Sequence, residues 1–470
     1  MGTTETLARW IVAAKYNEIP AAAIEQAKKS ILDYLGTAAY GSTTPLGRII
    51  IDFTREQGGN PQARVIATNI RTATTNAAFA NGAAGHAEDF DDLGGIGGHP
   101  ATVLTPTVLA LADELHLSGR DVLTAWVVGY EIGTRLSTNV HTDRDWHPTA
   151  IYGTMAAAAA ASKLLGLDVQ STRMALGIAG SEAGGLRRNF GTMTKPFHPG
   201  QAARNGVIAA KLASRGFTAD PDIIEGRQGY ADNFGGAKCN IPAMTRFLGK
   251  VYFLEEEGTR IKPWPCCGGN HQTLTGLLAL CKEKKLMAAE IEQVEHSGPN
   301  IPCTGALLRT EVRQGLEGKF SLAYNISAAI IDGKVDYETF TDKRAAKGDL
   351  QAFMARVRIS RSDDVVLRRP HIADGNPEAR LRVKMRDGRV HDVELGTAYH
   401  LTGDAVLDKF RLNAEAVLGR ERVARTIELV QRMEKLKDVA ELMDAVTIET
   451  KRAPTKRAHT SVSEKSLVSA

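Results

Sequence analysis

The stretch from Asp89 to His99 carries the densest group of chemically active side chains in the sequence. It holds three aspartates, four glycines and one histidine, and Pro100 follows it. Carboxylates this close repel one another, so one of them can keep its proton near neutral pH, where a histidine also titrates. The glycines let the backbone approach a bound molecule closely. Taken alone, the stretch fits a catalytic loop and a solvated acidic turn equally well.

Three further side chains stand where helices are expected to begin. His147 lies in Trp146-His147-Pro148, Lys195 precedes a helix expected to start near Gln201, and His271 follows a glycine pair. A helix N-terminus favours a bound anion and lowers the pKa of an imidazole. Alone, His147 is also explained as a helix cap and Lys195 as a solvated side chain, whereas the glycines and prolines before His271 fix an unusual backbone and favour a site. Together with the acidic loop, however, they suit a cavity for a substrate with several carboxylates.

Other chemistries fit the sequence less well. The glycines near position 95 lack the strand, helix and lysine of a phosphate loop, and no G-x-S-x-G elbow occurs in an α/β context. A metal bound by Asp89, Asp91 and His99 is conceivable, but oxygen-rich magnesium sites usually serve phosphates. The five cysteines do not show the paired spacing of a zinc site, and the adjacent Cys266 and Cys267 are expected to be small buried thiols.

Composition indicates a soluble globular protein. The 470 residues are too many for one ordinary core, so two domains are expected, and 43% of the residues are hydrophobic and 24% charged. A net charge of +4 does not imply a nucleic-acid partner. No targeting signal and no membrane-spanning run is recognisable, and we expect a cytoplasmic protein with no membrane partner.

Hydrophobic periodicity predicts a mainly α fold. Helices are expected over about 3–16, 20–36, 73–88, 105–117, 120–139, 147–166, 171–184 and 199–215. After about residue 260 we expect helices at 271–285 and 318–332, a strand at 355–360 and a hairpin around Asp387-Gly388. Helical patterning resumes from 403 to 448. The predicted division is a helical domain over 1–260, an α+β domain over 261–397, a helical return over 398–450, and a flexible tail over 451–470.

Four motifs, in matching order and spacing, resemble the MmgE/PrpD family from about residue 5 to residue 450. They run from Asp89 to Pro100, from Trp146 to Thr154, from Thr194 to Gly206, and from Lys262 to His271. Members of that family dehydrate 2-methylcitrate, decarboxylate cis-aconitate or epimerise iminodisuccinate. The resemblance implies a large all-helical domain interrupted by a smaller α+β lid domain, a homodimer, and no metal or organic cofactor.

The same resemblance implies a set of site residues: Asp89, His99, His147, Lys195 and His271. The reactions of the family pass through negative charge delocalised from carbon into a neighbouring carboxylate or imine. Lys195 and the helix N-termini would hold carboxylates and stabilise that charge. His99 or His147 would move the proton at carbon, Asp89 would orient its partner, and His271 would complete the pocket when the lid closes. Asp91 and Asp92 are interpreted as structural supports.

The favoured function is therefore a cofactor-independent lyase, a dehydratase or a decarboxylase. It would act on a small di- or tricarboxylic acid through a carboxylate-stabilised carbanion. Ala101-Thr102-Val103 after Pro100 departs from the segment typical of methylcitrate dehydratases. An iminodisuccinate-type epimerase, an isomerase using the same pocket, remains an alternative. A non-catalytic helical dimer is the second alternative.

Overall fold

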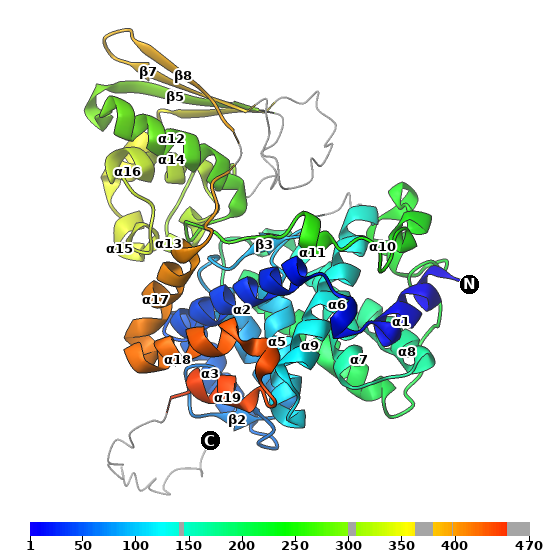
Figure 1. The fold of residues 1–470 in the computed structure, drawn as a ribbon. Coiled ribbons are helices and arrows are strands. Elements are labelled where there is room, and N and C mark those ends of the chain that lie inside the picture. Colours follow the sequence, from blue (N-terminus) through cyan, green and yellow to red (C-terminus); the bar gives the residue numbers. More distant parts are fainter. Residues whose placement is uncertain (141–144, 299–306, 362–378, 397, 449–470) are drawn as a thin grey trace, which may run out of the picture.

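The computed structural model describes residues 1–140, 145–298, 307–361, 379–396 and 398–448. The tail predicted over 451–470 lies outside these residues. The described chain is mainly α-helical with small sheets, as expected (Figure 1). No helix in this part of the chain is both long enough and apolar enough to cross a membrane.

The first 260 residues, together with the C-terminal helices, form what we call the helical body. Its first helices are α1 (Thr3–Ala13), α2 (Ala21–Gly41), α3 (Pro45–Gln57), α4 (Thr74–Gly85), α5 (Ala101–Leu115), α6 (Gly119–Asn139), α7 (Pro148–Leu164), α8 (Val169–Glu182), α9 (Thr194–Ala213), α10 (Tyr230–Phe234) and α11 (Phe253–Glu256). Two short antiparallel pairs join them: β1 (Ala63–Arg64) with β2 (Arg71–Thr72), and β3 (Leu93–Gly94) with β4 (Thr259–Arg260).

Helix α7 is the centre of the helical body because it is buried on every face and contains a run of six alanines. All residues from Pro148 to Ser162 are buried, and α5, α6, α8 and α9 pack around this helix. A Cβ atom on Gly206 of α9 would lie 2.3 Å from the Cβ of Ala157 on α7, so the two backbones approach more closely than any larger residue allows. This close packing fixes the N-termini of α7 and α9 beside each other.

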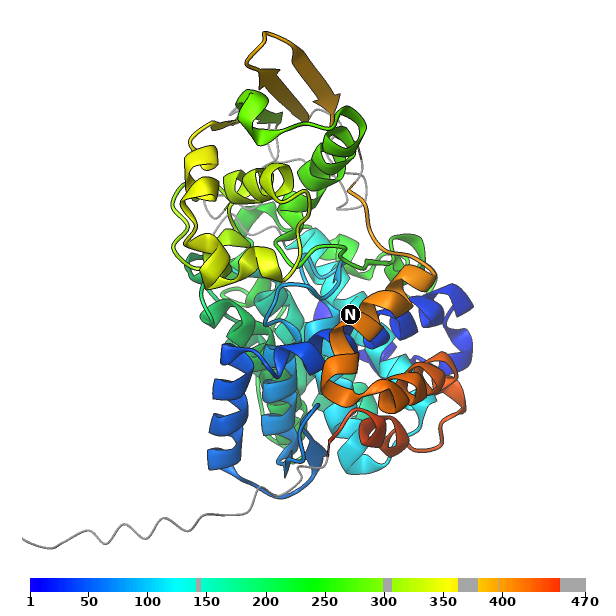
Figure 2. The same cartoon turned by 90° about the vertical axis from the view of Figure 1, so that its left-hand side faces the viewer.

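A second layer of structure, the sheet region (residues 264–396), stands on top of the helical body (Figures 1 and 2). Its sheet has the order β6-β5-β7-β8, with β5 and β6 parallel and the other pairs antiparallel. The strands are β5 (Ile291–Gly298), β6 (Val357–Arg361), β7 (Arg380–Met385) and β8 (Val390–Glu394). The helices are α12 (His271–Lys284), α13 (Gly315–Gly318), α14 (Leu322–Ile331), α15 (Asp342–Ala345) and α16 (Gly348–Met354).

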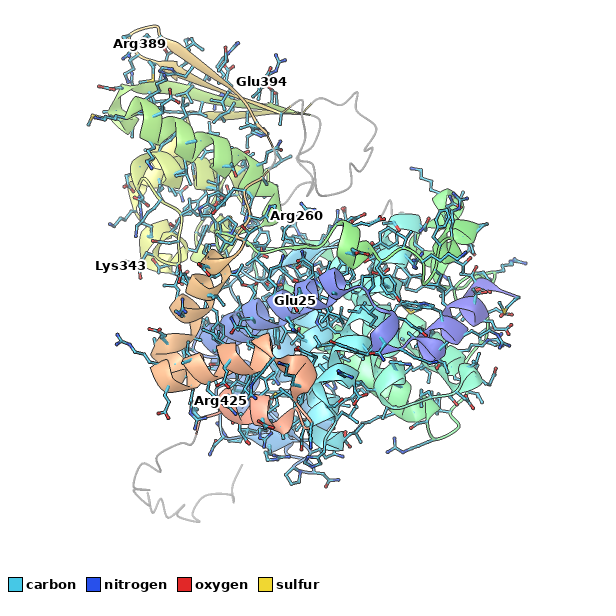
Figure 3. The ribbon with its side chains drawn as sticks, viewed as in Figure 1. Glu25, Arg260, Lys343, Arg389, Glu394 and Arg425 are labelled. Carbon is cyan, nitrogen blue, oxygen red and sulfur yellow. The ribbon has the colours of Figure 1, made fainter. Side chains whose placement is uncertain are left out.

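One face of this sheet is apolar and is covered by helices. Leu381, Val383 and Met385 of β7 are buried and alternate with more exposed basic residues, as the sequence pattern predicts. They belong to the same core as apolar residues of α12 and α14. In Figure 3, Arg389 lies at the far tip of this region and Arg260 lies where the chain leaves the helical body.

The chain then returns to the helical body through α17 (Asp404–Leu418), α18 (Arg420–Gln431) and α19 (Ala440–Ala445). Helix α17 runs down beside α2 (Figure 1), and the ring of Phe410 packs against Gly36. Segments far apart in the sequence therefore share one core. The sheet region lies in the chain between α11 and α17 of the helical body, and its division from that body as a separate domain remains a prediction.

Several boundaries differ from the sequence-based expectation. Helix α9 begins at Thr194 rather than near Gln201, so that Lys195 and Pro196 lie in its first turn and Pro199 lies inside it. Pro196 is tolerated because the N–H that it lacks has no helical partner in a first turn. Helix α2 continues to Gly41 rather than ending near Gly36, and helix α3 was not predicted.

Candidate active site

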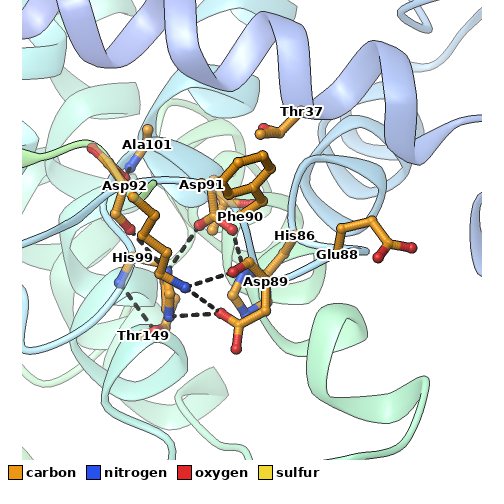
Figure 4. A network of polar contacts seen from close by, with 12 residues as sticks. Thr37, His86, Glu88, Asp89, Phe90, Asp91, Asp92, His99, Ala101 and Thr149 are labelled. Carbon is orange, nitrogen blue, oxygen red and sulfur yellow. Dashed lines mark hydrogen bonds and ion pairs between the residues drawn. The ribbon is translucent and has the colours of Figure 1, made fainter. Parts of the chain in front are cut away.

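The loop between α4 and α5 carries the acidic residues into the interior, so the alternative of a solvated turn is wrong. Asp89, Asp91, Asp92 and His99 are each no more than 6% exposed. Asp89 has a φ of +52°, a conformation that is unusual for an aspartate and costs backbone strain. Figure 4 shows the carboxylates of Asp89 and Asp91 directed at the rings of His86 and His99. Such strain is retained where the surrounding contacts fix it.

Asp89 is surrounded by positive and imidazole groups. Its Oδ1 lies 2.6 Å from Lys262 Nζ and 3.4 Å from both Lys195 Nζ and His99 Nε2. Burial alone would raise the pKa of this carboxyl, but Lys195 and Lys262 outweigh burial and hold the pKa well below its ordinary value. Asp89 is therefore a carboxylate, and its Oδ2 makes no hydrogen bond with the described residues.

Asp91 holds two histidines at once. Its Oδ1 lies 2.7 Å from His86 Nδ1, and its Oδ2 lies 3.0 Å from His99 Nδ1 (Figure 4). His99 Nδ1 is also 2.8 Å from the carbonyl oxygen of Asp92, so this nitrogen carries the hydrogen and donates. His99 Nε2 is then left with a lone pair that faces Asp89. Asp91 thus sets the orientation of both rings, a larger role than the structural support predicted for it.

Asp92 acts as the structural support that the sequence predicts. It accepts a hydrogen bond of 3.0 Å from the backbone N–H of Ala101, in the first turn of α5. Burial raises the pKa of Asp92 well above its ordinary value, and the neighbouring Asp91 carboxylate adds to this shift. Of the three aspartates in the loop, Asp89 and Asp91 thus have lowered pKa values, and Asp92 has a raised one.

Lys195 reaches this cluster from the first turn of α9. Its ammonium lies 2.5 Å from His86 Nε2 and is flanked by the rings of Phe190 and Phe320, at 5.1 and 5.2 Å from their centroids. Burial lowers the pKa of Lys195, although Asp89 opposes the shift. The result is a desolvated ammonium beside a carboxylate and several imidazoles.

His86 belongs to the site, and the sequence analysis missed it. It follows the last residue of α4, is fully buried, and links Asp91 to Lys195. The one local feature of the sequence that could have indicated His86 is its position three residues before Asp89. Its most informative partner, Lys195, lies 109 positions away in the sequence.

His147 also lies in the cluster, as predicted, at the N-cap position of α7. Its Nδ1 is 3.0 Å from Nδ1 of His198, so one of the two rings donates and the other accepts. Its ring lies 6.2 Å from that of His86 and meets Phe190 edge-on at 4.9 Å. Burial and the charge of Lys195 lower the pKa of His147 well below its ordinary value and that of His198 to about 4.

His271, the first residue of α12, reaches the edge of the cluster from the sheet region. Its Nε2 donates to the carbonyl oxygen of Cys266 at 3.2 Å, and Lys262 Nζ donates to the same oxygen at 3.1 Å. Burial and Lys262 lower the pKa of His271 to about 3. His271 therefore joins the other predicted residues through a shared carbonyl, without a direct bond to Asp89. As predicted, Cys266 and Cys267 are buried thiols.

Three buried lysines fix the loop from three different parts of the chain. The carbonyl oxygens of Glu88, Asp89 and Phe90 accept hydrogen bonds from Lys319, Lys262 and Lys409 respectively, at 3.0, 2.7 and 2.6 Å. Lys262 and Lys319 reach the loop from the segments around α12 and α13, and Lys409 reaches it from α17. None of these lysines was predicted as a site residue: Lys262 begins the fourth motif but was not assigned a role, and Lys319 and Lys409 lie outside the motifs. They explain how the strained backbone at Asp89 is held.

A metal ion fits this cluster poorly. One ligand atom from each of His86, Asp89, Asp91 and His99 can be chosen so that all lie within 4.8 Å of one another. The ammonium of Lys262 already neutralises Asp89, and Lys195 donates to His86. A divalent cation would therefore be repelled by two ammonium groups at hydrogen-bond distance from its ligands. The donor set suits acid–base chemistry better than metal binding.

The cluster combines what a reaction with a carbon acid requires. It offers a desolvated ammonium, three helix N-termini, neutral imidazoles that can take up a proton, and a carboxylate that orients them. A separate cavity of about 530 Å³ lies in the sheet region, lined by Trp264, Cys281, Leu286, Ile330 and Val335 among others. That cavity is mainly apolar and contains no acid–base cluster, so we assign the chemistry to the buried site.

The comparisons with known proteins agree with this architecture. Residues 5–240 match the MmgE/PrpD N-terminal domain and residues 264–435 match the MmgE/PrpD C-terminal domain. The cis-aconitate decarboxylases of Mus musculus and Homo sapiens are both 28% identical to the chain, over 93% of it and 92% and 93% of their own lengths. Cis-aconitate decarboxylase of Aspergillus terreus is 27% identical, over 96% of the chain and 97% of that protein. The resemblance carried by the four motifs is thus confirmed, and the chain belongs to the MmgE/PrpD family.

Proposed function

We propose that the protein is a cofactor-independent lyase that removes carbon dioxide from a small unsaturated tricarboxylic acid of the cis-aconitate type. The observation that supports this most directly is the buried ammonium of Lys195, held among neutral histidines and beside Asp89. The family and the decarboxylase relatives, which align along nearly the whole chain, support a lyase acting on a small carboxylic acid. Dehydration of a similar acid is less favoured because the relatives that match are decarboxylases.

The chemistry makes clear demands on the site. When the bond from carbon to the departing carboxylate breaks, carbon dioxide leaves and the electron pair moves into the neighbouring double bond. The resulting allylic carbanion is delocalised into a remaining carboxylate and takes up one proton at carbon. Each turnover therefore consumes one proton and needs a positive group beside the carboxylate on which charge accumulates.

The described residues can meet these demands. Lys195 and the N-termini of α7 and α9 would bind the retained carboxylates and stabilise the charge of the carbanion. His99 Nε2, which faces Asp89 at 3.4 Å, would supply the proton to carbon. Burial lowers the pKa of His99, so the protonated ring is a stronger acid than a solvated histidine. His147 and His271 would complete the walls of the site.

Access to the site would require movement of the sheet region. The site residues are almost fully buried, and they come from both the helical body and the segment between Lys262 and His271. Opening between these two parts would admit substrate, and closure would exclude water from the carbanion. This is the lid role expected for residues 261–397.

We further propose a homodimer in the cytoplasm. Phe53 of α3 and Phe197 of α9 are 43% and 39% exposed, and both contact the ring of Phe79 edge-on. An exposed aromatic group of this kind is typical of a surface that is covered in an assembly. Cys266 and Cys281 are thiols, as a reducing compartment would favour.

The assignment is tested by incubating the purified protein, treated with a chelator, with cis-aconitate, 2-methylcitrate and iminodisuccinate in D2O. We expect cis-aconitate to release carbon dioxide and to give a product with one deuterium at the new C–H bond. Water loss from 2-methylcitrate alone would establish a dehydratase, and racemised iminodisuccinate alone would establish the epimerase. No turnover of any of the three would support the non-catalytic dimer.

A matched pair of lysine variants of α9 links the activity to the site. Lys195→Met should reduce kcat/KM at least about 1,000-fold, because the ammonium is the positive charge nearest to the proposed carbanion. Lys211→Met, at the other end of the same helix, removes a lysine that is bound to Glu114 and should retain near-normal activity. Equal activities of the two variants would contradict the proposed role of Lys195.

A further inference from the structure

We propose that His86 is a positioning residue for Lys195: its neutral ring, fixed by Asp91, accepts a hydrogen bond from the Lys195 ammonium, aims it at the substrate and keeps it charged. The role in turnover rests on the proposed function. The effect on the ammonium itself does not, because it follows from the contacts between the two side chains.

The hydrogen bonds define the state of the His86 ring. An ammonium can only donate, so His86 Nε2, 2.5 Å from Lys195 Nζ, must be the acceptor. The hydrogen of a neutral ring then lies on Nδ1, which donates to Asp91 Oδ1 at 2.7 Å. Burial, together with the charge of Lys195, lowers the pKa of His86 to about 3, although Asp91 opposes the shift. Both ring nitrogens are therefore engaged, and the ring has one possible tautomer.

Lys195 depends on this acceptor. Within the described part of the chain, the contact with His86 is the shortest polar contact of the ammonium, and Asp89 Oδ1 is 3.4 Å away. The rings of Phe190 and Phe320 flank the ammonium and offer only their faces. Removal of the His86 acceptor would leave a desolvated ammonium with one long contact, which disfavours its charged form.

The titratable groups around Lys195 determine the pH at which its ammonium loses a proton. Besides His86, the titratable groups that face it are Asp89, Asp91, His99, His147, His198, Lys262 and Cys267. The carboxylates favour the charged ammonium, whereas Lys262 and burial disfavour it. A neutral variant of His86 changes none of these charges, so its effect on Lys195 reports on the hydrogen bonds of the residue at position 86.

Two variants separate the role of an acceptor from that of a space-filling side chain. In His86→Gln, the amide oxygen lies near the position of Nε2 and can accept from Lys195. In His86→Asn, the amide group lies near the position of Nδ1 and can donate to Asp91 but does not reach Lys195. Both variants are polar, neutral and smaller than histidine, so a purely structural role predicts similar behaviour for the two.

We expect His86→Asn to lower kcat about 10- to 100-fold, the effect of losing a hydrogen bond to a charged group. The basic limb of its kcat/KM profile should move to lower pH by about one unit, because Lys195 loses its proton more easily. His86→Gln should stay within about threefold of the wild type and keep the basic limb in place. Equal losses in the two variants, or an unmoved basic limb in His86→Asn, would overturn the inference.

A measurement without substrate keeps this test independent of the proposed function. In protein labelled with 15N-lysine, the Nζ signal that is lost in Lys195→Met reports the protonation state of Lys195 as the pH is varied. We expect the titration midpoint to fall in His86→Asn and not in His86→Gln. If the wild type turns over none of the three acids, the proposed function fails, and this titration alone decides the role of His86. Identical midpoints in the wild type and both variants would refute it.

Discussion

At the scale of single residues, the site is organised by hydrogen bonds that fix which nitrogen of each histidine carries a proton. Asp91 accepts from Nδ1 of His86 and lies 3.0 Å from Nδ1 of His99, so the Nε2 atoms of both rings are directed at other groups. In His86 that atom meets Lys195, and in His99 it meets Asp89. The Asp91 carboxylate thus orients both rings: the His86 ring accepts a hydrogen bond, and the His99 ring can exchange a proton.

This division of roles predicts the behaviour of His99→Asn. The asparagine amide can take over the hydrogen bond from Nδ1 to the Asp92 carbonyl oxygen, but it cannot carry a proton to carbon. We expect kcat to fall by about 100- to 10,000-fold, the usual worth of a general acid, with a smaller change in KM. Steady-state kinetics of carbon dioxide release measure both constants.

The matched control is His116→Asn, which changes an exposed histidine at the end of α5. It should leave kcat and KM unchanged. If His99→Asn retained more than a tenth of the wild-type kcat while binding substrate normally, another group would have to supply the proton.

At the scale of elements, much of the helical architecture and part of the site follow from the sequence. Helix α7 and the hairpin of β7 and β8 were predicted because an unbroken run of alanines and a strict alternation are strong local signals. Strand β5 was missed because its pattern is irregular, although it is the central strand that pairs with both β6 and β7. A local pattern thus predicts a helix or strand only when the types of its own residues show which of them are buried.

Contacts between distant segments explain what the sequence could not predict. Asp89, His99, His147, Lys195 and His271 stand in recognisable motifs, whereas His86, Lys319 and Lys409 gain their significance only from partners in other elements. The predicted start of α9 was wrong because Pro196 and Pro199 are typical of helix boundaries in a sequence. Tertiary packing overrides such local signals.

The connection between the sheet region and the Asp89 loop can be tested at Lys319. This buried ammonium donates to Glu88 Oε2, to the Glu88 carbonyl oxygen and to the Pro265 carbonyl oxygen, at 2.7, 3.0 and 2.9 Å. Lys319→Met should lower the free energy of unfolding by about 1–3 kcal/mol, because it leaves these partly buried acceptors without their donor. Unfolding by guanidinium chloride, followed by circular dichroism, measures the change.

Lys343→Met provides the comparison, because Lys343 is an exposed lysine of α15. Its substitution should change the free energy of unfolding by less than about 0.5 kcal/mol. Similar unfolding midpoints for the two variants would show that the lysine does not connect the sheet region to the loop.

At the scale of the whole molecule, buried neutral histidines make stability depend on pH. Burial lowers the pKa values of His86 and His271 to about 3 and those of His198 and His296 to about 4. At all of these except His296, the charge of a neighbouring lysine adds to the effect of burial. An unfolded histidine has a pKa of about 6.5, so between these values the unfolded chain binds protons that the folded protein does not. Asp33, Asp92, Asp113 and Glu131 act in the opposite direction, because burial raises their pKa values, for Glu131 to about 7. Burial also lowers the pKa values of His99 and His147, so six histidines outnumber these four carboxyl groups, and we expect stability to fall as the pH drops below about 6.5.

His296 isolates one proton of this effect because it lies outside the active site, in β5, and its Nδ1 has no hydrogen-bond partner among the described residues. Each such histidine contributes about 1.4 kcal/mol per pH unit to the slope of stability against pH, with stability increasing as the pH rises. His296→Gln cannot take up a proton, so its slope between about pH 6 and pH 5 should be smaller by that amount. Guanidinium unfolding at a series of pH values gives the slopes for the wild type and for His296→Gln. An unchanged slope in His296→Gln would show that His296 takes up its proton in the folded protein as readily as in the unfolded chain.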